Sequence, residues 1–214
     1  MGFEICDSPQ TFNPKPQTLY INKVENSEET HPWQPFLPDG TKMLMLGSFP
    51  PAKHRWAMDF FYPNYINDMW RIFGLCLHGD KNKYVDEEKR TFRLEDIKAM
   101  LQEKGIGLYD TAVKVRRTKN TASDKDLEVL QPTDIDQLLR DAPLCHTVVT
   151  TGQKATDILT GHFNIAPPKV GMFTTFNFYG REMRLYRMPS SSRAYPMKLE
   201  NKAQYYQTLF ERLD

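Results

Sequence analysis

Residues 44–70 hold most of the side chains that could bind a flat, polar ligand. The segment reads LMLGSFPPAKHRWAMDFFYPNYINDMW, and its second half contains the aromatic rings of Phe60, Phe61, Tyr62 and Tyr65 and the amides of Asn64 and Asn67. Aromatic faces stack on planar rings, and side-chain amides both donate and accept hydrogen bonds. This combination is typical of a site for a planar heterocycle with polar edges.

Two further segments contain groups that could contact phosphate. GSFPP (47–51) offers a glycine and a hydroxyl, and MPSSSRAYP (188–196) offers three hydroxyls and Arg193 between two prolines. Serine hydroxyls and backbone N–H groups in short loops bind phosphate oxygens, and an arginine adds positive charge. Taken singly, each segment is also the sequence of a polar turn, which is the commoner case.

A third segment, VKVRRTKNTASDK (113–125), is predicted to be a basic loop. It concentrates positive charge at Lys114, Arg116, Arg117, Lys119 and Lys125. A solvated basic loop is commoner than a nucleic-acid contact. Convergence of all three segments at one edge of the fold would favour a polyanionic ligand.

The elements that must position these loops follow from the hydrophobic pattern. Short apolar runs predict strands at 43–46, 106–110, 146–152 and 183–189. Helical spacing predicts helices from near Asn67, over 94–103, over 133–140 with Thr133 as cap, over 154–159 and over 199–213. Strands that alternate with helices imply a three-layer α/β/α sandwich whose central, mainly parallel sheet has about four strands. Ligands bind at the carboxyl ends of such strands, where the loops above are expected to meet.

The amino-terminal part differs from the rest in composition. Residues 1–42 are rich in proline and are predicted to form an arm with a strand at 19–21, and residues 43–214 are predicted to form one α/β domain. The segment 78–90 is expected to be a charge-rich loop. A net charge of +1 neither suggests nor excludes a polyanionic partner, because the local distribution of charge decides.

The spacing of the cysteines and the hydropathy pattern restrict the metal sites and the cellular compartments that we expect for this protein. The three cysteines are far apart, and neither they nor the histidines have the spacing of metal ligands. No signal-peptide core and no apolar run of about 18 residues is present. We therefore expect a cytoplasmic protein that binds neither metal nor membrane.

The order of these motifs resembles that of the uracil-DNA glycosylase superfamily, most closely its mismatch-specific and deoxyinosine (hypoxanthine) branches. GSFPP, FYPNYINDMWRIFG, KGIGLYDTAVKVRR, VVTTGQKA and MPSSSRA follow one another as the family's motifs do, over roughly residues 43–212. The resemblance implies an enzyme that flips a damaged deoxynucleotide out of DNA and hydrolyses its N-glycosidic bond. It also implies that the enzyme needs no cofactor.

The resemblance assigns roles to individual residues. It implies that Asn67 is catalytic and that Tyr62, or Phe61 if the alignment shifts by one, stacks on the flipped base, with Phe49 and Asn64 completing the base-binding wall. The residues implied to contact the DNA backbone are Gly47, Ser48, Ser190, Ser191, Ser192 and Arg193. Asp110 is assigned a structural role at the end of its strand, ahead of a catalytic one.

Two positions depart from the family pattern. Phe49 stands where better-known members have the Asp or Asn that orients water, and Met188 stands where many have a His or Asn that donates to the leaving base. Either catalysis rests on Asn67, with Asp59 or Asp68 as less favoured helpers, or the activity is reduced or altered.

Three functions are therefore compatible with the sequence. The leading one is a monomeric, monofunctional glycosylase acting on DNA that contains a deaminated base, uracil or hypoxanthine. It is monofunctional because no lysine occupies a motif position from which it could form a Schiff base. The alternatives are a damaged-DNA-binding module of the same fold with reduced catalysis, and a small-molecule α/β hydrolase.

Overall fold

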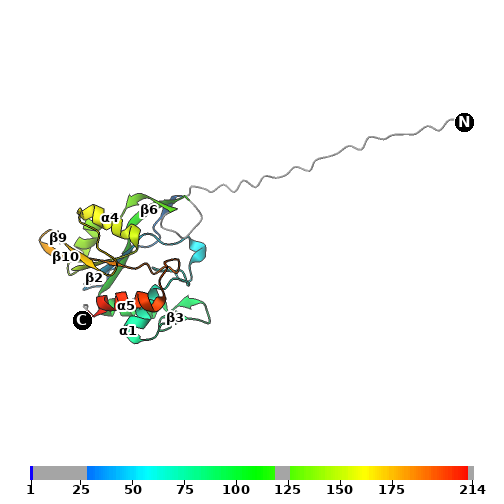
Figure 1. The fold of residues 1–214 in the computed structure, drawn as a ribbon, viewed down its shortest axis with the longest axis horizontal. Helices are drawn as coiled ribbons and strands as arrows, with labels where there is room; N and C mark the ends of the chain where they lie inside the picture. The colour runs from blue at the N-terminus through cyan, green and yellow to red at the C-terminus, as the bar shows by residue number, and fades with distance from the viewer. Residues whose placement is uncertain (2–27, 119–125, 212–214) are drawn as a thin grey trace.

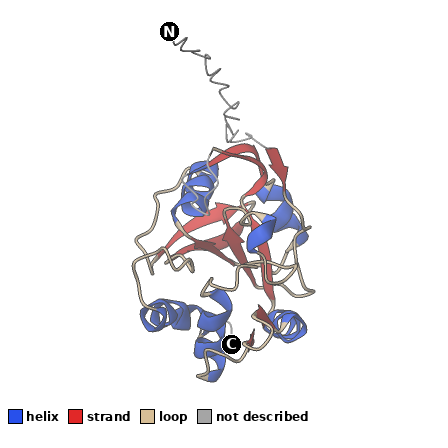
Figure 2. Cartoon of the chain, turned by 90° about the vertical axis from the view of Figure 1, so that its right-hand side faces the viewer, coloured by secondary structure: helices blue, strands red, loops and turns tan. Residues whose placement is uncertain are grey.

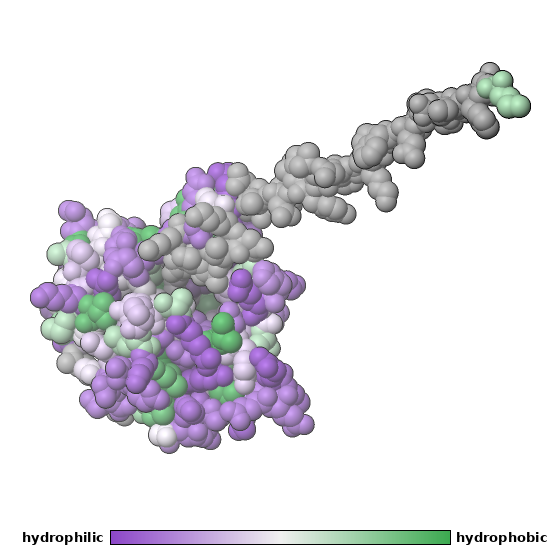
Figure 3. Space-filling view, turned by 45° about the vertical axis from the view of Figure 1, so that its right-hand side comes forward, coloured by the Kyte–Doolittle hydropathy of each residue, from purple (hydrophilic) through white to green (hydrophobic). Residues whose placement is uncertain are grey.

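The structure is a computed structural model that describes Met1, residues 28–118 and residues 126–211. The strand predicted at 19–21 lies outside these residues, as do Lys119 and Lys125. Among the described residues, no helix combines the length and the apolar character needed to cross a membrane. On the face shown in Figure 3, hydrophobic residues lie singly or in small groups between hydrophilic ones.

The central sheet has five strands in a mixed α/β fold. Its order is β5 (Ile106–Asp110), β2 (Met43–Gly47), β8 (Thr147–Thr151), β10 (Arg181–Met188) and β9 (Phe173–Phe178). The first four are the predicted strands, and they pair in parallel. The prediction of about four strands missed β9, which pairs with β10 in antiparallel fashion. Tyr179 and Gly180, both with positive φ, form the tight turn between them.

The five predicted helices are present as α1 (Met69–His78), α2 (Leu94–Lys104), α3 (Ile135–Asp141), α4 (Gln153–Phe163) and α5 (Leu199–Phe210). In Figures 1 and 2, α4 lies on one side of the central sheet, and α1 and α5 lie on the other. Helix α3 is capped by Asp134, which accepts a hydrogen bond from the Gln137 N–H, so the prediction that Thr133 is the cap was wrong. The Thr133 hydroxyl instead donates to the Asp110 carbonyl.

The predicted basic loop is, over its first five residues, part of a strand. A second sheet contains β1 (Glu28–Thr30), β6 (Ala112–Arg117) and β7 (Leu127–Pro132) in the order β1-β6-β7. Lys114 and Arg116 pair with Glu28, and Arg116 also pairs with Glu128. Much of the positive charge is therefore neutralised across the sheet, which the sequence pattern did not show because Glu28 is remote in the chain.

Residues 28–42, the described part of the predicted arm, pack on the domain. Beyond β1, Phe36 and Leu108 exchange two backbone hydrogen bonds, of 3.0 and 2.8 Å, which add a bridge at the edge of β5. A further short hairpin, β3 (Val85–Asp86) and β4 (Thr91–Phe92), lies at the end of the predicted charge-rich loop.

A buried ion pair links α5 to the start of α1. The Lys202 ammonium is fully buried and donates to the Asp68 carboxylate at 2.9 Å and to the Ser192 carbonyl at 2.7 Å. Arg193 reaches the other oxygen of Asp68 at 3.2 Å. Lys202 therefore holds the loop after β10 against α1.

Replacing Lys202 with methionine should lower the free energy of unfolding by about 3–5 kcal/mol, because the Asp68 carboxylate would stay buried with only Arg193 as a charged partner. Urea denaturation of the purified variant measures this loss. The double variant Lys202→Met with Asp68→Asn removes both charges and should recover part of the loss. Equal losses in the single and double variants would contradict a charge-pairing role.

Candidate functional site

A cavity of about 660 Å³ lies at the carboxyl ends of β2, β5 and β8. Its walls are formed by residues 47–51, 62–64, 190–192 and 194–196, together with Trp33, Asn67, Asp110, Arg117, Leu127 and Thr151. The volume lies in the range typical of small-molecule sites. All the predicted site residues line this cavity except Phe61 and Arg193.

The sheet topology explains the position of the cavity. From β2 the chain crosses to β5 on one side and then returns to β8 on the other, so the connections diverge at β2. A crevice forms at such a switch point, outside the carboxyl ends of the strands. Gly47, the last residue of β2, lies at this point.

Tyr62 provides an aromatic wall in an unusual backbone conformation. Its φ is +51°, a value that a bulky residue rarely adopts. The Tyr62 hydroxyl lies 3.0 Å from the Thr151 hydroxyl, and its ring lies edge-on to Trp70 at 6.0 Å between centroids. Contacts on two sides thus hold Tyr62 in place, and backbone strain of this kind is concentrated at functional sites.

The other two predicted aromatic residues are packed differently. Phe61 is 2% exposed and its ring contacts Trp33 and His31, so it lies behind the cavity wall. Phe49 lines the cavity, and it also packs with Val115 and Leu127 in a small apolar cluster. Of the alternatives Tyr62 and Phe61, Tyr62 is the residue that reaches the cavity.

Asn64 and Asn67 present hydrogen-bond donors. The Asn64 side-chain carbonyl accepts from the Ile66 N–H at 3.1 Å, and that of Asn67 accepts from the Met69 N–H at 2.9 Å. The second contact explains why α1 begins at Met69. Among the described residues, neither Nδ2 group has a hydrogen-bond partner. The two amides can therefore donate to acceptors on a ligand.

The loop after β10 is a rigid series of turns. Ser190 Oγ accepts from the Ser192 N–H, and Ser192 Oγ accepts from the Ala194 N–H, each at 3.2 Å. The Tyr206 hydroxyl of α5 donates to the Pro189 carbonyl at 2.9 Å, and burial raises the pKa of Tyr206 well above its usual value. Arg193 is exposed at the rim and does not line the cavity.

Arg117 holds the loop after β2 from the opposite side. Its guanidinium forms two hydrogen bonds to the Glu29 carboxylate and donates to the Pro50 carbonyl at 2.6 Å. It also lies over the Phe49 ring, 5.8 Å from the centroid. Glu29 balances this charge, so Arg117 contributes shape more than net positive potential.

Asp110 and His31 are functional candidates that sequence reasoning ranked low. Asp110 is 7% exposed and lines the cavity, and its Oδ2 lies 3.0 Å from the Nε2 of His31. Of the other candidates, Asp59 accepts from the Trp33 indole and Asp68 is paired with Lys202. Met188 is buried and does not line the cavity. In the sequence, the position of Asp110 at the end of a strand was the only indication of a functional role. The sequence did not show that His31, which is remote in the chain, would be its partner.

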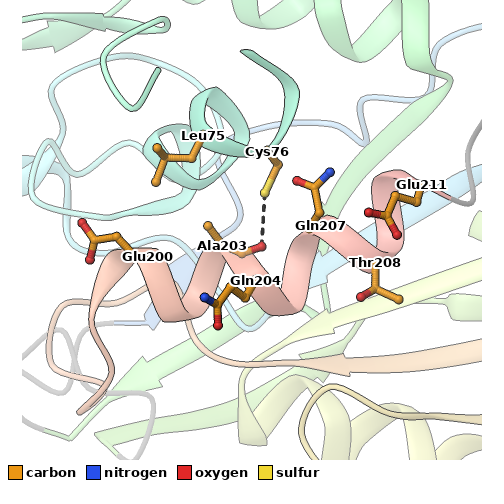
Figure 4. Close-up of a pocket in the computed structure, with 8 residues that line it drawn as sticks. All are labelled: Leu75, Cys76, Glu200, Ala203, Gln204, Gln207, Thr208 and Glu211. Atoms are coloured by element: carbon orange, nitrogen blue, oxygen red, sulfur yellow. Dashed lines mark hydrogen bonds between the residues drawn. The ribbon is translucent and has the colours of Figure 1, made fainter. Parts of the chain in front are cut away.

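A second cavity lies between α1 and α5 and has different properties. It is lined by Leu75 and Cys76 of α1 and by Glu200 and other residues of α5 and its carboxyl end (Figure 4). The carboxylates of Glu200 and Glu211 would repel a phosphate. The Cys76 thiol donates a hydrogen bond to the Ala203 carbonyl. Across residues 28–118 and 126–211, no three His, Cys, Asp or Glu side chains form a group that could hold a metal ion.

Solved structures with a similar fold include one from an archaeal protein. It is the solution NMR structure of a protein from Methanosarcina acetivorans, described as a "putative Uracil DNA glycosylase", with a TM-score of 0.57 and 20% sequence identity. The match covers 86% of this chain and 98% of that chain. The two chains share a fold. No protein-family model and no curated protein matches the sequence.

The substitution Gly47→Ala should lower the free energy of unfolding by about 1–3 kcal/mol. A Cβ at Gly47 would lie 2.4 Å from Asp110 Oδ1, and the pairing with His31 keeps that carboxylate from moving aside. The matched control is Gly161→Ala in α4, where a Cβ has no atom within 4 Å. The control should raise stability by about 0.5–1 kcal/mol in thermal unfolding. A destabilisation of equal size at both positions would contradict the steric argument.

Cys76 should resist alkylation at neutral pH, because burial raises the pKa of its thiol to about 12 and only the thiolate reacts. Its reactivity should increase only as the pH approaches that value, provided that the fold persists. Iodoacetamide labelling of the folded chain at pH 7.5, followed by peptide mass spectrometry, checks this. Rapid labelling of Cys76 in the folded protein would show that the thiol is accessible and ionised.

Proposed function

We propose that this chain is a monofunctional DNA glycosylase that hydrolyses the N-glycosidic bond of a deaminated base, uracil or hypoxanthine, without metal or cofactor. The observation that carries the proposal is the pair of amide donors at Asn64 and Asn67 beside the Tyr62 ring. Deamination replaces an exocyclic amino group, which donates hydrogen bonds, with a carbonyl, which accepts them. Two amide donors beside an aromatic face, without a partner in the described part of the chain, complement such a base.

The shared fold with the M. acetivorans protein supports the same proposal, since that protein is described as a glycosylase. The mismatch-specific and deoxyinosine branches remain the proposed placement. The finer choice between uracil and hypoxanthine depends on how the two Nδ2 groups meet carbonyls at different positions on the ring.

The proposed mechanism uses the cavity walls in three ways. The flipped base stacks on Tyr62 while Asn64 and Asn67 donate to its acceptor atoms, the two carbonyl oxygens of uracil or the one carbonyl oxygen and a ring nitrogen of hypoxanthine, which stabilises the negative charge that develops on the base as the bond breaks. Gly47, Ser48 and Ser190–Ser192 contact the sugar and the neighbouring phosphates. Arg193, exposed at the rim, pairs with a backbone phosphate.

Positive charge at the rim supports a DNA partner. Lys53 and His54 are exposed on the short 3₁₀ turn η1 (Lys53–Arg55), directly after the loop that follows β2. Neither forms an ion pair with an acidic side chain among the described residues. Lys53 and Arg193 thus place cationic groups on both loops that bound the cavity, and phosphate binding of this kind weakens as salt rises.

The test is a gel assay with duplexes that carry uracil, hypoxanthine or xanthine, scored for band shift and for strand cleavage at abasic sites after alkali. Base release from a uracil or hypoxanthine duplex is the expected result. Tight, salt-sensitive binding without release would favour the binding-module alternative. Neither binding nor release would favour a small-molecule hydrolase.

Two substitutions at Asn67 separate its structural role from its role toward the base. Asn67→Asp keeps an oxygen that accepts from the Met69 N–H and removes the Nδ2 donor. It should preserve the melting temperature and lower the single-turnover rate of base release by roughly 10²-fold or more, the scale of losing one transition-state donor. Asn67→Ala should lower both the rate and the stability. A variant Asn67→Asp with the wild-type rate would show that Asn67 only holds the start of α1 through the Met69 N–H.

A further inference from the structure

The Asp110 carboxylate lines the cavity, with one oxygen held by His31 and the other left open. His31 Nε2 lies 3.0 Å from Oδ2, whereas Oδ1 has no hydrogen-bond partner among the described residues. Oδ1 lies against the α-carbon of Gly47, at the switch point of the sheet. A carboxylate oxygen left open beside a cavity can accept a hydrogen bond from a water molecule bound there.

The hydrogen-bond partners of His31 determine which of its two ring nitrogens can carry a proton. Its side chain is 1% exposed, and Nδ1 lies 2.8 Å from the Trp33 carbonyl oxygen and 3.2 Å from the Trp33 nitrogen. A neutral ring can accept from the Trp33 N–H at Nδ1, and a protonated ring can donate from Nδ1 to the Trp33 carbonyl. With Asp110 ionised, Nε2 carries a proton and donates to Oδ2 in both cases. The pair can therefore hold an additional proton without a movement of heavy atoms.

Aromatic rings enclose the histidine. Tyr109, Phe49 and Phe61 have ring centroids 4.7, 5.5 and 6.0 Å from that of His31. These contacts fix the orientation of the imidazole and exclude water from its far side. His31 comes from the segment before β2, 79 residues away from Asp110, so its placement depends on the packing of residues 28–36.

We infer that Asp110 is a catalytic residue that orients and deprotonates the attacking water, and that His31 is a positioning residue that acts through it; this inference rests on the proposed function. The N-glycosidic bond breaks and its electron pair leaves with the base. The water oxygen forms the new bond to C1′, and one water proton passes to the Asp110–His31 pair. The departing base anion takes a proton from solvent.

This assignment supplies a group that the loop after β2 lacks. Phe49 occupies the position where a water-orienting Asp or Asn was expected from the family resemblance, and its side chain cannot bind water. Asp110 reaches the same cavity from the neighbouring strand, because Gly47 and Asp110 are register partners in the β2–β5 pair. General base catalysis of this kind contributes about 10²–10⁴-fold to a rate.

The experiment uses the full chain and measures single-turnover base release from the duplex that the wild type cleaves best. Asp110→Asn is isosteric, and its amide oxygen can still accept from His31, so the fold and the melting temperature should be kept. The rate should fall about 10²–10⁴-fold. His31→Gln should lower the rate by a smaller factor. Both variants should bind a duplex with a tetrahydrofuran abasic-site analogue as tightly as the wild type, measured by fluorescence anisotropy.

The matched control is Asp141→Asn at the exposed end of α3, which should keep the wild-type rate. A wild-type rate in a folded Asp110→Asn variant would overturn the inference and leave the glycosylase proposal intact. A wild type that releases no base from any duplex would instead overturn the proposed function, and the inference with it. Weaker binding of the analogue, with an unchanged rate at saturation, would show that Asp110 acts only in recognition.

Discussion

The contact between Gly47 and Asp110 determines the geometry of the site. These residues are opposite one another in the parallel pair of β2 and β5, and the Asp110 carboxylate occupies the space that a side chain at position 47 would need. The Thr111 N–H donates to the Gly47 carbonyl at 2.9 Å, which keeps the two strand ends together as the chain leaves the sheet. A polar group is thereby held beside the switch point, where the connections on either side separate and leave space for a ligand.

Two charged networks hold the loops around this point. Arg117 links Glu29 to the Pro50 carbonyl on one side, and Lys202 links Asp68 to the Ser192 carbonyl on the other. Buried ion pairs contribute little to net stability, because desolvation offsets most of their attraction. Their directional hydrogen bonds instead restrict each loop to one arrangement, and a preorganised wall loses less entropy when a ligand binds.

Much of the fold was accessible from the sequence, because buried parallel strands and amphipathic helices leave strong local patterns. The four parallel strands and the five helices were predicted in this way, as was the meeting of the loops after Gly47 and Met188. Two of the missed features depend on side chains that other strands place beside them. Strand β6 reads as a basic loop until Glu28 and Glu128 are placed beside it, and Asp110 reads as a turn residue until His31 is placed against it. The sequence also did not distinguish Tyr62 from Phe61, since only the packed structure shows that Tyr62 lines the cavity and that Phe61 is buried behind it.

The long sequence separation of these contacts has a kinetic consequence. His31 and Asp110 are 79 residues apart, and Asp68 and Lys202 are 134 residues apart. The entropy of closing the intervening loop must be lost before such contacts stabilise the chain, so we expect them to form after local helices and hairpins. The cavity is thus expected to be among the last features to assemble. On the ribosome, a nascent chain whose α5 had not yet emerged would lack Lys202, which holds the loop after β10 against α1, so the capacity to act on a ligand would appear only with the completed fold.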